Sequence, residues 1–194
     1  MPASMTTFTG RRLNLLKLSV EDICIEDIAH HLATLNRFVG ALRRPVSIAQ
    51  HSVYVARLVQ GTGWEKEALF HDAAEAYLGD VSKWLKEMPE MALYREAEDR
   101  AMSVICEALG LRYDMNRYIK WADDLMVRFE ALMEANNSDM FTRATHPKPT
   151  PEEIEKVGEW APWTWQASER AFLDHARLLG YKVAVRPGLT RHLR

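Results

Sequence analysis

The sequence predicts an all-α fold in one domain, and three observations carry this prediction. Apolar residues recur at the spacing of helical turns through most of the chain. Capping residues and glycines separate these stretches at the places where helices are expected to begin and end. The 194 residues are 47% hydrophobic and 27% charged, which is ordinary for a globular domain with a sizeable core. We expect one domain over residues 1–194, with its core at about 7–135 and a C-terminal helical extension at about 150–182.

The N-terminal part of the chain begins with a stretch that is not helical in pattern. Residues 6–18 alternate irregularly between polar and apolar side chains, which indicates an extended arm or a two-stranded piece laid over the helical body. Ser19 is typical of a helix start, and an apolar stripe after it predicts a helix that runs up to the next loop. Residues 36–45 should form that loop, because Gly40 permits unusual backbone angles and Pro45 disfavours helix at the residue before it.

Two predicted helices in the middle of the chain form an antiparallel pair. The first covers about 47–60 and starts at Ser47, which is a good capping residue. The second covers about 64–78 and ends at Gly79, and residues 61–63 supply a short turn between the two. Such a hairpin can bring side chains of the two helices together.

The C-terminal half continues the helical pattern. Helical stretches are expected at about 81–88, 90–109, 114–135 and 164–179, with a proline-rich loop at 145–151. Three tryptophans lie within residues 160–165, at the start of the last predicted helix. We expect them to attach that helix to the body or to form a dimer face, and a base-binding pocket is the alternative.

Charge and cysteine usage argue against several classes of function. The formal net charge is −2 with both signs interspersed, so neither duplex nucleic acid nor an anionic membrane is an expected partner. Cys24 and Cys106 form no CxxC pair, which favours a reducing compartment. Residues 1–12 contain no apolar signal segment, and no later run approaches the roughly 18 apolar residues of a membrane helix. We therefore expect a cytoplasmic protein.

The stretch from residue 70 to residue 80 contains a histidine, three carboxylates and a glycine, which indicates a metal site. His71 and Asp72 are adjacent within it. His51 lies on the preceding predicted helix, and Asp123 lies on the helix expected at 114–135. Two imidazoles and two carboxylates suit one divalent transition ion, such as Mn²⁺, Fe²⁺, Co²⁺, Ni²⁺ or Zn²⁺.

A second pair of histidines, His30 and His31, lies on the first predicted helix. A histidine pair on an amphipathic helix is typical of surface or satisfied core positions, so we do not expect these two residues to hold the metal. The sequence thus contains two histidine pairs with different expected roles.

The order of the four candidate ligands along the chain resembles the HD-domain phosphohydrolase superfamily. The resemblance covers about residues 7–135 and implies an HD-type helical bundle. Asp123 fits the Ala-Asp pattern of that superfamily, whereas Asp124 is rotated by about 100° around the helix. We therefore expect Asp123, and not Asp124, to be the fourth metal ligand.

Local motifs are similar to two branches of that superfamily. Residues 71–80 follow the motif His-Asp-x-x-Glu-x-x-x-Gly-Asp, which resembles the 5′-deoxynucleotidase branch. Arg37 and Phe38 precede the first histidine, where that branch carries an arginine and an aromatic residue. Residues 25–53 resemble small phage and prophage HD proteins, some of which are deoxynucleotide triphosphohydrolases.

The resemblance implies roles for residues beyond the metal ligands. Glu75 is expected to orient or deprotonate a water molecule, and Asp80 to transfer a proton at the nucleophile or at the leaving oxygen. Arg37 is expected to offset phosphate charge. Phe38 either stacks on a base or sugar or belongs to the core. Arg43, Arg44 and Lys83 are expected to add positive charge that binds phosphate. The alternative is that they are solvated surface charges.

The resemblance, together with these residues, implies a metal-dependent phosphohydrolase of nucleotides, in the first place a 5′-nucleotidase that releases phosphate from deoxynucleoside monophosphates. A deoxynucleoside triphosphate triphosphohydrolase of the dATP/dNTPase type is the alternative, and it needs positive charge for three phosphates. A regulatory protein that binds a nucleotide or a metal through a degenerate site is the second alternative. The apolar C-terminal tail and the family resemblance predict a homo-oligomer, a dimer or larger.

Overall fold

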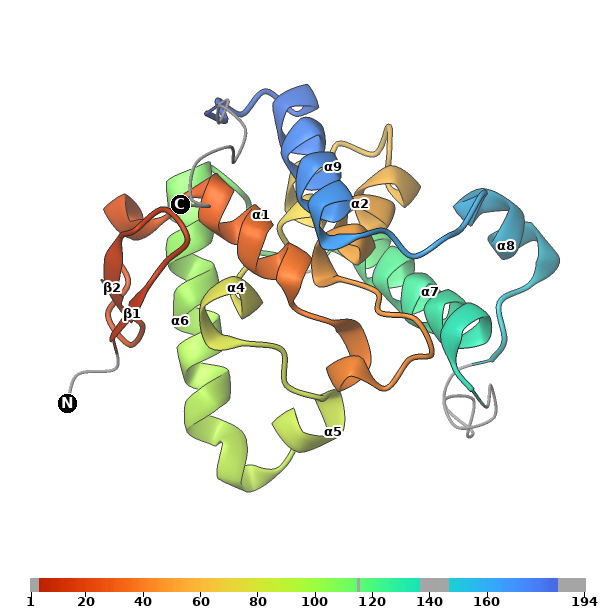
Figure 1. Cartoon of the computed structure of the whole chain (residues 1–194), viewed down its shortest axis with the longest axis horizontal. Coiled ribbons are helices and arrows are strands. Elements are labelled where there is room, and N and C mark those ends of the chain that lie inside the picture. Colours follow the sequence, from red (N-terminus) through yellow and green to blue (C-terminus); the bar gives the residue numbers. More distant parts are fainter. Residues whose placement is uncertain (1–3, 115, 137–146, 185–194) are drawn as a thin grey trace, which may run out of the picture.

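The computed structural model of the chain describes residues 4–114, 116–136 and 147–184 (Figure 1). These residues form a mainly helical body with a two-stranded antiparallel sheet at its N-terminal end, which confirms the predicted all-α class and the predicted N-terminal piece. In chain order the elements are β1 (Ser4–Thr6), β2 (Arg12–Asn14), η1 (Val20–Asp22), α1 (Ile25–Thr34), η2 (Arg37–Gly40), α2 (Ile48–Leu58), α3 (Glu65–Leu69), α4 (Glu75–Leu78), α5 (Lys83–Lys86), η3 (Pro89–Met91), α6 (Ala92–Leu109), α7 (Arg117–Glu134), α8 (Pro151–Val157) and α9 (Trp165–Leu178).

Helix α2 lies at the centre of the fold and packs against α1, α3, α7 and α9. Its residues from Ile48 to Ala56 are all buried, so polar side chains among them must find partners inside the protein. The hydroxyl of Ser47 accepts a hydrogen bond from the backbone N–H of Gln50 at 3.1 Å and caps the first turn, as predicted. His51 is therefore held in the core rather than at the surface.

The N-terminal arm pairs in the register Ser4 with Asn14, Met5 with Leu13, and Thr6 with Arg12. Its turn is fastened to α1 by Asp27, whose carboxylate accepts hydrogen bonds from the backbone N–H of Thr9 at 2.6 Å and from the Thr9 hydroxyl at 2.7 Å. His31 makes a second connection, because its Nε2 accepts from the Phe8 N–H at 3.3 Å and its Nδ1 lies 2.7 Å from the Ala76 carbonyl oxygen. The arm is thus tied both to α1 and to the segment that contains α4.

The helix predicted at 64–78 is wrong as one element, because α3 and α4 are separated by a turn at residues 70–74. His71 supplies a physical reason. Its Nδ1 lies 2.8 Å from the Ala68 carbonyl oxygen, which is the acceptor that the Asp72 N–H would use in a continuous α-helix. The side chain thereby takes the place of one backbone hydrogen bond, and the chain turns.

The loop predicted at 36–45 contains a strained backbone segment. Phe38 and Val39 have φ angles of 55° and 54°, in the left-handed region that a β-branched residue rarely adopts. The backbone N–H of Arg37 donates to the Val46 carbonyl at 2.8 Å and ties the entry of the loop to its exit. This tie fixes the backbone from which the Arg37 side chain extends.

The tryptophan-rich segment attaches the last helix to the body, which confirms one of its two expected roles. The buried amide of Gln50 on α2 donates to the Ala161 carbonyl at 2.9 Å and accepts from the Trp163 N–H at 2.9 Å. The rings of Trp160 and Trp163 pack against Tyr54, with centroids 5.3 Å and 5.5 Å apart. The expected dimer face stays a prediction.

Residues 145 and 146 of the loop predicted at 145–151 lie outside the described residues. Helix α8 begins at Pro151, inside the helical extension expected at about 150–182, but a separate helix at this place was not predicted. The Thr150 hydroxyl accepts from the Glu153 N–H at 3.2 Å, and the Glu153 carboxylate accepts from the Thr150 N–H at 2.8 Å. This capping box, with Pro151 in the first turn, explains why a helix starts there.

Candidate metal centre

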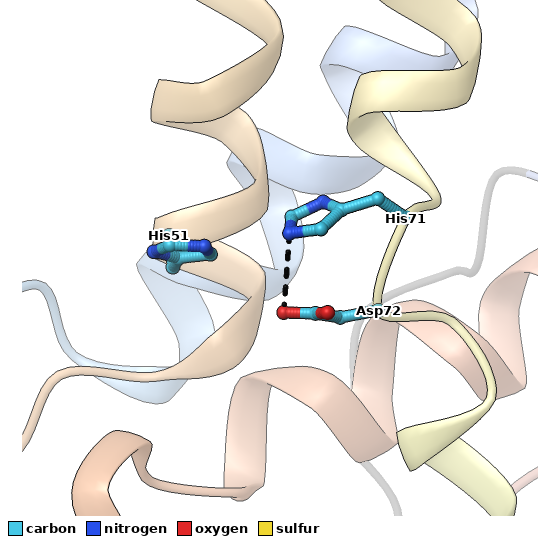
Figure 2. A group of neighbouring side chains, drawn as sticks. All are labelled: His51, His71 and Asp72. Carbon is cyan, nitrogen blue, oxygen red and sulfur yellow. Dashed lines mark ion pairs between the residues drawn. The ribbon is translucent and has the colours of Figure 1, made fainter. Parts of the chain in front are cut away.

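The four predicted ligands meet in the interior, where α2, α7 and the turn between α3 and α4 come together. His51 extends from α2, Asp123 from α7, and His71 and Asp72 from the turn. His51, His71 and Asp72 each offer one ligand atom within 4.8 Å of one another, and Figure 2 shows their side chains directed toward a common point. The Oδ1 atom of Asp123 lies 3.1 Å from Nε2 of His51 and 3.9 Å from Nε2 of His71. The spacing predicted from sequence therefore corresponds to a cluster in space.

Each histidine of the cluster has its other ring nitrogen bound to an acceptor. Nδ1 of His51 lies 2.8 Å from Oε1 of Glu130, and Nδ1 of His71 lies 2.8 Å from the Ala68 carbonyl oxygen. A carboxylate or a carbonyl can only accept, so each Nδ1 carries the hydrogen and each neutral ring directs the Nε2 lone pair toward the centre. This arrangement is characteristic of metal-ligating histidines, whose second nitrogen donates to a carboxylate or a backbone carbonyl.

The environment of His71 Nε2 also fits a metal ligand. This atom is buried and makes no hydrogen bond of good geometry within the described part of the chain, although Oδ2 of Asp72 lies 3.2 Å away. A buried polar atom left without a partner is costly unless another group satisfies it. A divalent cation would satisfy it, so the residues present fit a metal ion.

The charges of the cluster perturb one another strongly. Burial would lower the pKa of His71, but the facing carboxylates of Asp72 and Asp123 raise it well above its ordinary value. The pKa of His51 is raised too, against the effect of burial, by Glu130 and Asp123. Burial would raise the pKa values of the two aspartates, but the imidazoles hold both below the ordinary range. Protons here occupy the same ring nitrogens that a metal ion would bind, so metal and protons should compete.

Arg37 lies beside the cluster, as predicted. Its Nη1 is 3.4 Å from Oδ2 of Asp72, and its Nε is 3.2 Å from Oε2 of Glu130. Burial would lower the pKa of Arg37, but the charges of Glu130 and Asp72 raise it, so the guanidinium stays charged. Glu130 is fully buried and joins Arg37 to His51. Glu130 was not predicted as a site residue. The one indication of it in the sequence is its position seven residues after Asp123, on the same face of the helix.

Glu75 and Asp80, the two predicted proton-transfer residues, flank α4. Glu75 is the first residue of α4, and burial and then the charge of Asp72 raise its pKa to about 8. Its Oε1 is 3.1 Å from Nζ of Lys86, and its Oε2 is buried with no hydrogen-bond partner among the described residues. Burial also raises the pKa of Asp80, although Arg37 and Lys86 act against that effect. Both carboxyl groups can therefore exchange a proton nearer to neutrality than ordinary carboxyl groups do.

The other predicted phosphate-binding cations are placed elsewhere. The Arg43 guanidinium donates to the Met133 carbonyl at 2.8 Å, and the Arg44 guanidinium forms a two-pronged pair with Glu134 at 2.5 Å and 2.8 Å. Both arginines thus bind the C-terminal end of α7, where cations are favoured by the helix dipole. Lys83 is exposed on α5. Lys86, which sequence reasoning did not single out, is the lysine of α5 that reaches Glu75.

A cavity of about 480 Å³ adjoins the cluster and is lined by His71, Asp72 and Glu75 on one side. Its apolar wall includes Met102 from α6 and Ile119 from α7. Its cations are already paired: Lys86 binds Glu75 and Glu98, and Arg112 binds Glu67 at 2.7 Å. The cavity thus offers apolar surface and acceptor oxygens next to the cluster.

No helix in the three described ranges has both the length and the apolar character that a membrane span requires.

Comparison with known proteins identifies relatives. No protein-family model matches the chain. It is 38% identical over 124 residues to the uncharacterized protein YfdR of Escherichia coli (strain K12), a match that covers 64% of this chain and 68% of YfdR. It is also 37% identical over 155 residues to an uncharacterized protein of Rhodobacter capsulatus, covering 74% of this chain and 79% of that protein.

Proposed function

The chain belongs to the family of YfdR and its Rhodobacter capsulatus relative, and we propose that it is a metal-dependent phosphohydrolase of the HD superfamily acting on deoxynucleoside monophosphates. The single observation that carries the proposal is the convergence of His51 and His71 on Asp72 and Asp123, with both Nδ1 atoms held by acceptors outside the cluster. The HD resemblance of the motif at residues 71–80 supplies the reaction class.

The four ligands would hold one divalent transition ion, which when bound would polarise a phosphoryl oxygen and make hydroxide available at neutral pH. The chain's own residues do the remaining work in this proposal. Glu75 accepts a proton from the attacking water, and its raised pKa makes its carboxylate a stronger base than that of an ordinary glutamate. Arg37 offsets charge on the phosphate next to Asp72.

Hydrolysis forms a bond between the water oxygen and phosphorus and breaks the bond between phosphorus and the 5′ oxygen. The products are a nucleoside and orthophosphate. The 5′ oxygen needs a proton as it leaves, and Asp80 is the donor in our proposal, because its raised pKa keeps more of it protonated than an ordinary aspartate.

The distribution of charge supports a monophosphate over a triphosphate. Arg43 and Arg44 bind the end of α7, and both cations of the neighbouring cavity are paired with carboxylates. A β- or γ-phosphate in that cavity would meet more carboxylates than free positive charge. An uncharged nucleoside suits the cavity better.

The test is product analysis with metal-loaded protein. The metal-free chain is supplied with Mn²⁺, Co²⁺, Ni²⁺ or Zn²⁺ and with deoxynucleoside mono- and triphosphates, and products are separated by ion-pair chromatography, with Asp72→Ala as control. Nucleoside and orthophosphate from monophosphates would support the proposal. Nucleoside and intact triphosphate would replace it with the triphosphohydrolase, and a bound but unchanged nucleotide would replace it with a regulatory binding protein.

A further inference from the structure

Lys86 occupies a position that the proposed roles of the other residues leave unexplained. It is the last residue of α5, its side chain is 20% exposed, and its Nζ lies 3.1 Å from Oε1 of Glu75 and 2.6 Å from Oε1 of Glu98. One ammonium group therefore joins a proposed proton-transfer residue to α6. A half-buried lysine between two carboxylates is far more restricted than a surface lysine.

Three residues of α6 hold Lys86 in place. Glu98 binds its ammonium group directly, and the ring of Tyr94 lies 5.8 Å from Nζ. The Tyr94 hydroxyl also donates to the Gly79 carbonyl at 2.7 Å, which fastens the end of α4 to the same helix. The Arg95 guanidinium donates to the carbonyl of Lys86 itself and, at 2.9 Å, to that of Met88. Helix α6 thus fixes both α5 and the end of α4.

The two oxygens of the Glu75 carboxylate have different surroundings as a result. Oε1 accepts from Lys86, whereas Oε2 is buried and has no hydrogen-bond partner within the described ranges. Glu75 lines the cavity together with His71 and Asp72, so the carboxylate borders the candidate metal centre. An anchored oxygen next to a free one is what a carboxylate needs to present one defined atom to a water molecule.

We infer that Lys86 is the positioning residue of Glu75: its ammonium group, held by Glu98, fixes one carboxylate oxygen so that the other can take the proton of the attacking water. The inference rests on the proposed function. In this inference Lys86 acts through Glu75 and not on the phosphate, because Glu75 and Glu98 offset the charge of its ammonium group. Its effect should therefore be on turnover and should require Glu75.

The kinetic test uses the full-length, metal-loaded chain and a deoxynucleoside monophosphate. Lys86→Met should lower kcat by about a hundredfold, the order of loss that misplacement of a catalytic group by about 1 Å can cause, and should change KM little. Lys86→Arg should recover most of that loss, since a guanidinium can still donate to both carboxylates. A loss that appears in KM instead would mean that Lys86 binds substrate and would overturn the inference, as would an unchanged kcat.

Glu98→Gln provides a second, milder variant in case Lys86→Met fails to fold. It keeps the shape of the side chain and weakens its hold on Lys86, so kcat should fall by about tenfold. Glu96→Gln is the matched control on the same helix, because Glu96 is exposed and has a distant partner, Arg100 at 3.7 Å. Equal effects of the two glutamine variants would overturn the inference.

A double-mutant cycle tests whether Lys86 acts through Glu75. In a Glu75→Gln background, Lys86→Met should cause no further loss of kcat, whereas independent roles would make the two losses multiply. Urea unfolding of the same four proteins needs no turnover, and the two substitutions should be clearly non-additive in the free energy of unfolding. Additive unfolding effects would contradict the contact even if the protein hydrolyses nothing, whereas failure of every monophosphate in the unsubstituted protein would contradict the proposed function alone.

Discussion

The two histidine pairs of the chain show how the same side chain serves different purposes. His51 and His71 each give Nδ1 to an acceptor and direct Nε2 into a cluster of aspartates. His31 uses both ring nitrogens on backbone groups, Nε2 on the Phe8 N–H and Nδ1 on the Ala76 carbonyl. His30 stacks on Phe8 with ring centroids 3.5 Å apart and pairs with Glu169 at 3.3 Å. A histidine is a candidate ligand when one ring nitrogen is held by an acceptor outside the cluster and the other faces carboxylates that it shares with a second histidine.

The largest expected difference is between an alanine substitution in the first histidine pair and one in the second. His71→Ala should abolish metal binding and measurable hydrolysis, because it removes one of the converging ligands. His31→Ala should keep both and lower the free energy of unfolding by about 1–3 kcal/mol, the cost of two lost hydrogen bonds and the backbone groups left behind. Metal analysis and urea unfolding of both variants measure the difference. Loss of metal in the His31 variant would break the comparison.

The second-largest effect should come from Glu130, whose carboxylate accepts the hydrogen bond of His51 Nδ1. Glu130→Gln should weaken metal affinity or activity by about 10–100-fold, because the glutamine amide no longer accepts from Nδ1 as strongly. Glu134→Gln is the matched control, since Glu134 is also fully buried and lies one turn further along α7 but binds Arg44 and Trp160. It should lower stability and leave metal affinity unchanged. Similar metal affinities of the two variants would show that Glu130 does not orient His51.

The pH dependence of the metal-free protein gives a smaller effect. The raised pKa of His71 contributes stability that is present below its ordinary value of 6.5 and is lost as the pH rises through the folded-state value. Glu75 also makes the stability fall as the pH rises, because its pKa is near the ordinary 4.5 in the unfolded chain and about 8 in the folded protein. The melting temperature in chelator should therefore fall as the pH rises above 6.5, and less steeply in His71→Ala. A flat profile would contradict the cluster's electrostatics.

The smallest effect should come from Arg44→Met, which tests an arginine that lies away from both histidine pairs. Its guanidinium binds Glu134 at the end of α7 rather than the candidate centre. The variant should lose a little thermal stability and keep its KM for a deoxynucleoside monophosphate. A several-fold rise in KM would restore the role in phosphate binding that the sequence predicts.

The candidate ligands could be singled out from sequence because their residue types suit a metal ion and their order along the chain resembles that of the HD superfamily. The break in the helix at 70–74 could not be predicted, because strong helix formers precede it at 65–69 and no glycine or proline lies within residues 64–78. The contact at the break is the hydrogen bond between Nδ1 of His71 and the Ala68 carbonyl, which propensities and apolar spacing do not indicate. The capping box of α8 was visible in the sequence as Thr150-Pro151-Glu152-Glu153 and was missed.

Sequence patterns could not show which of Lys83 and Lys86 reaches the candidate site, for a different reason. Both lie in a helix of four residues, which is too short for a periodic signal to show which face is buried. The packing of α5 on α6 decides that Lys86 reaches Glu75 and Glu98. A residue such as Lys86, whose inferred role is to position another side chain, is therefore hard to identify from a sequence pattern.

The most direct measurement is metal binding by Asp123→Ala and by its neighbour Asp124→Ala, with titration calorimetry of Mn²⁺ or Co²⁺ into metal-free protein. Asp123 lies 3.1 Å from His51, whereas Asp124 pairs with Lys120 at 3.2 Å on the helix surface. We expect one ion per chain for the unsubstituted protein and for Asp124→Ala, and no measurable binding for Asp123→Ala. Unchanged binding by Asp123→Ala, or loss of binding in Asp124→Ala instead, would contradict the assignment of the metal centre.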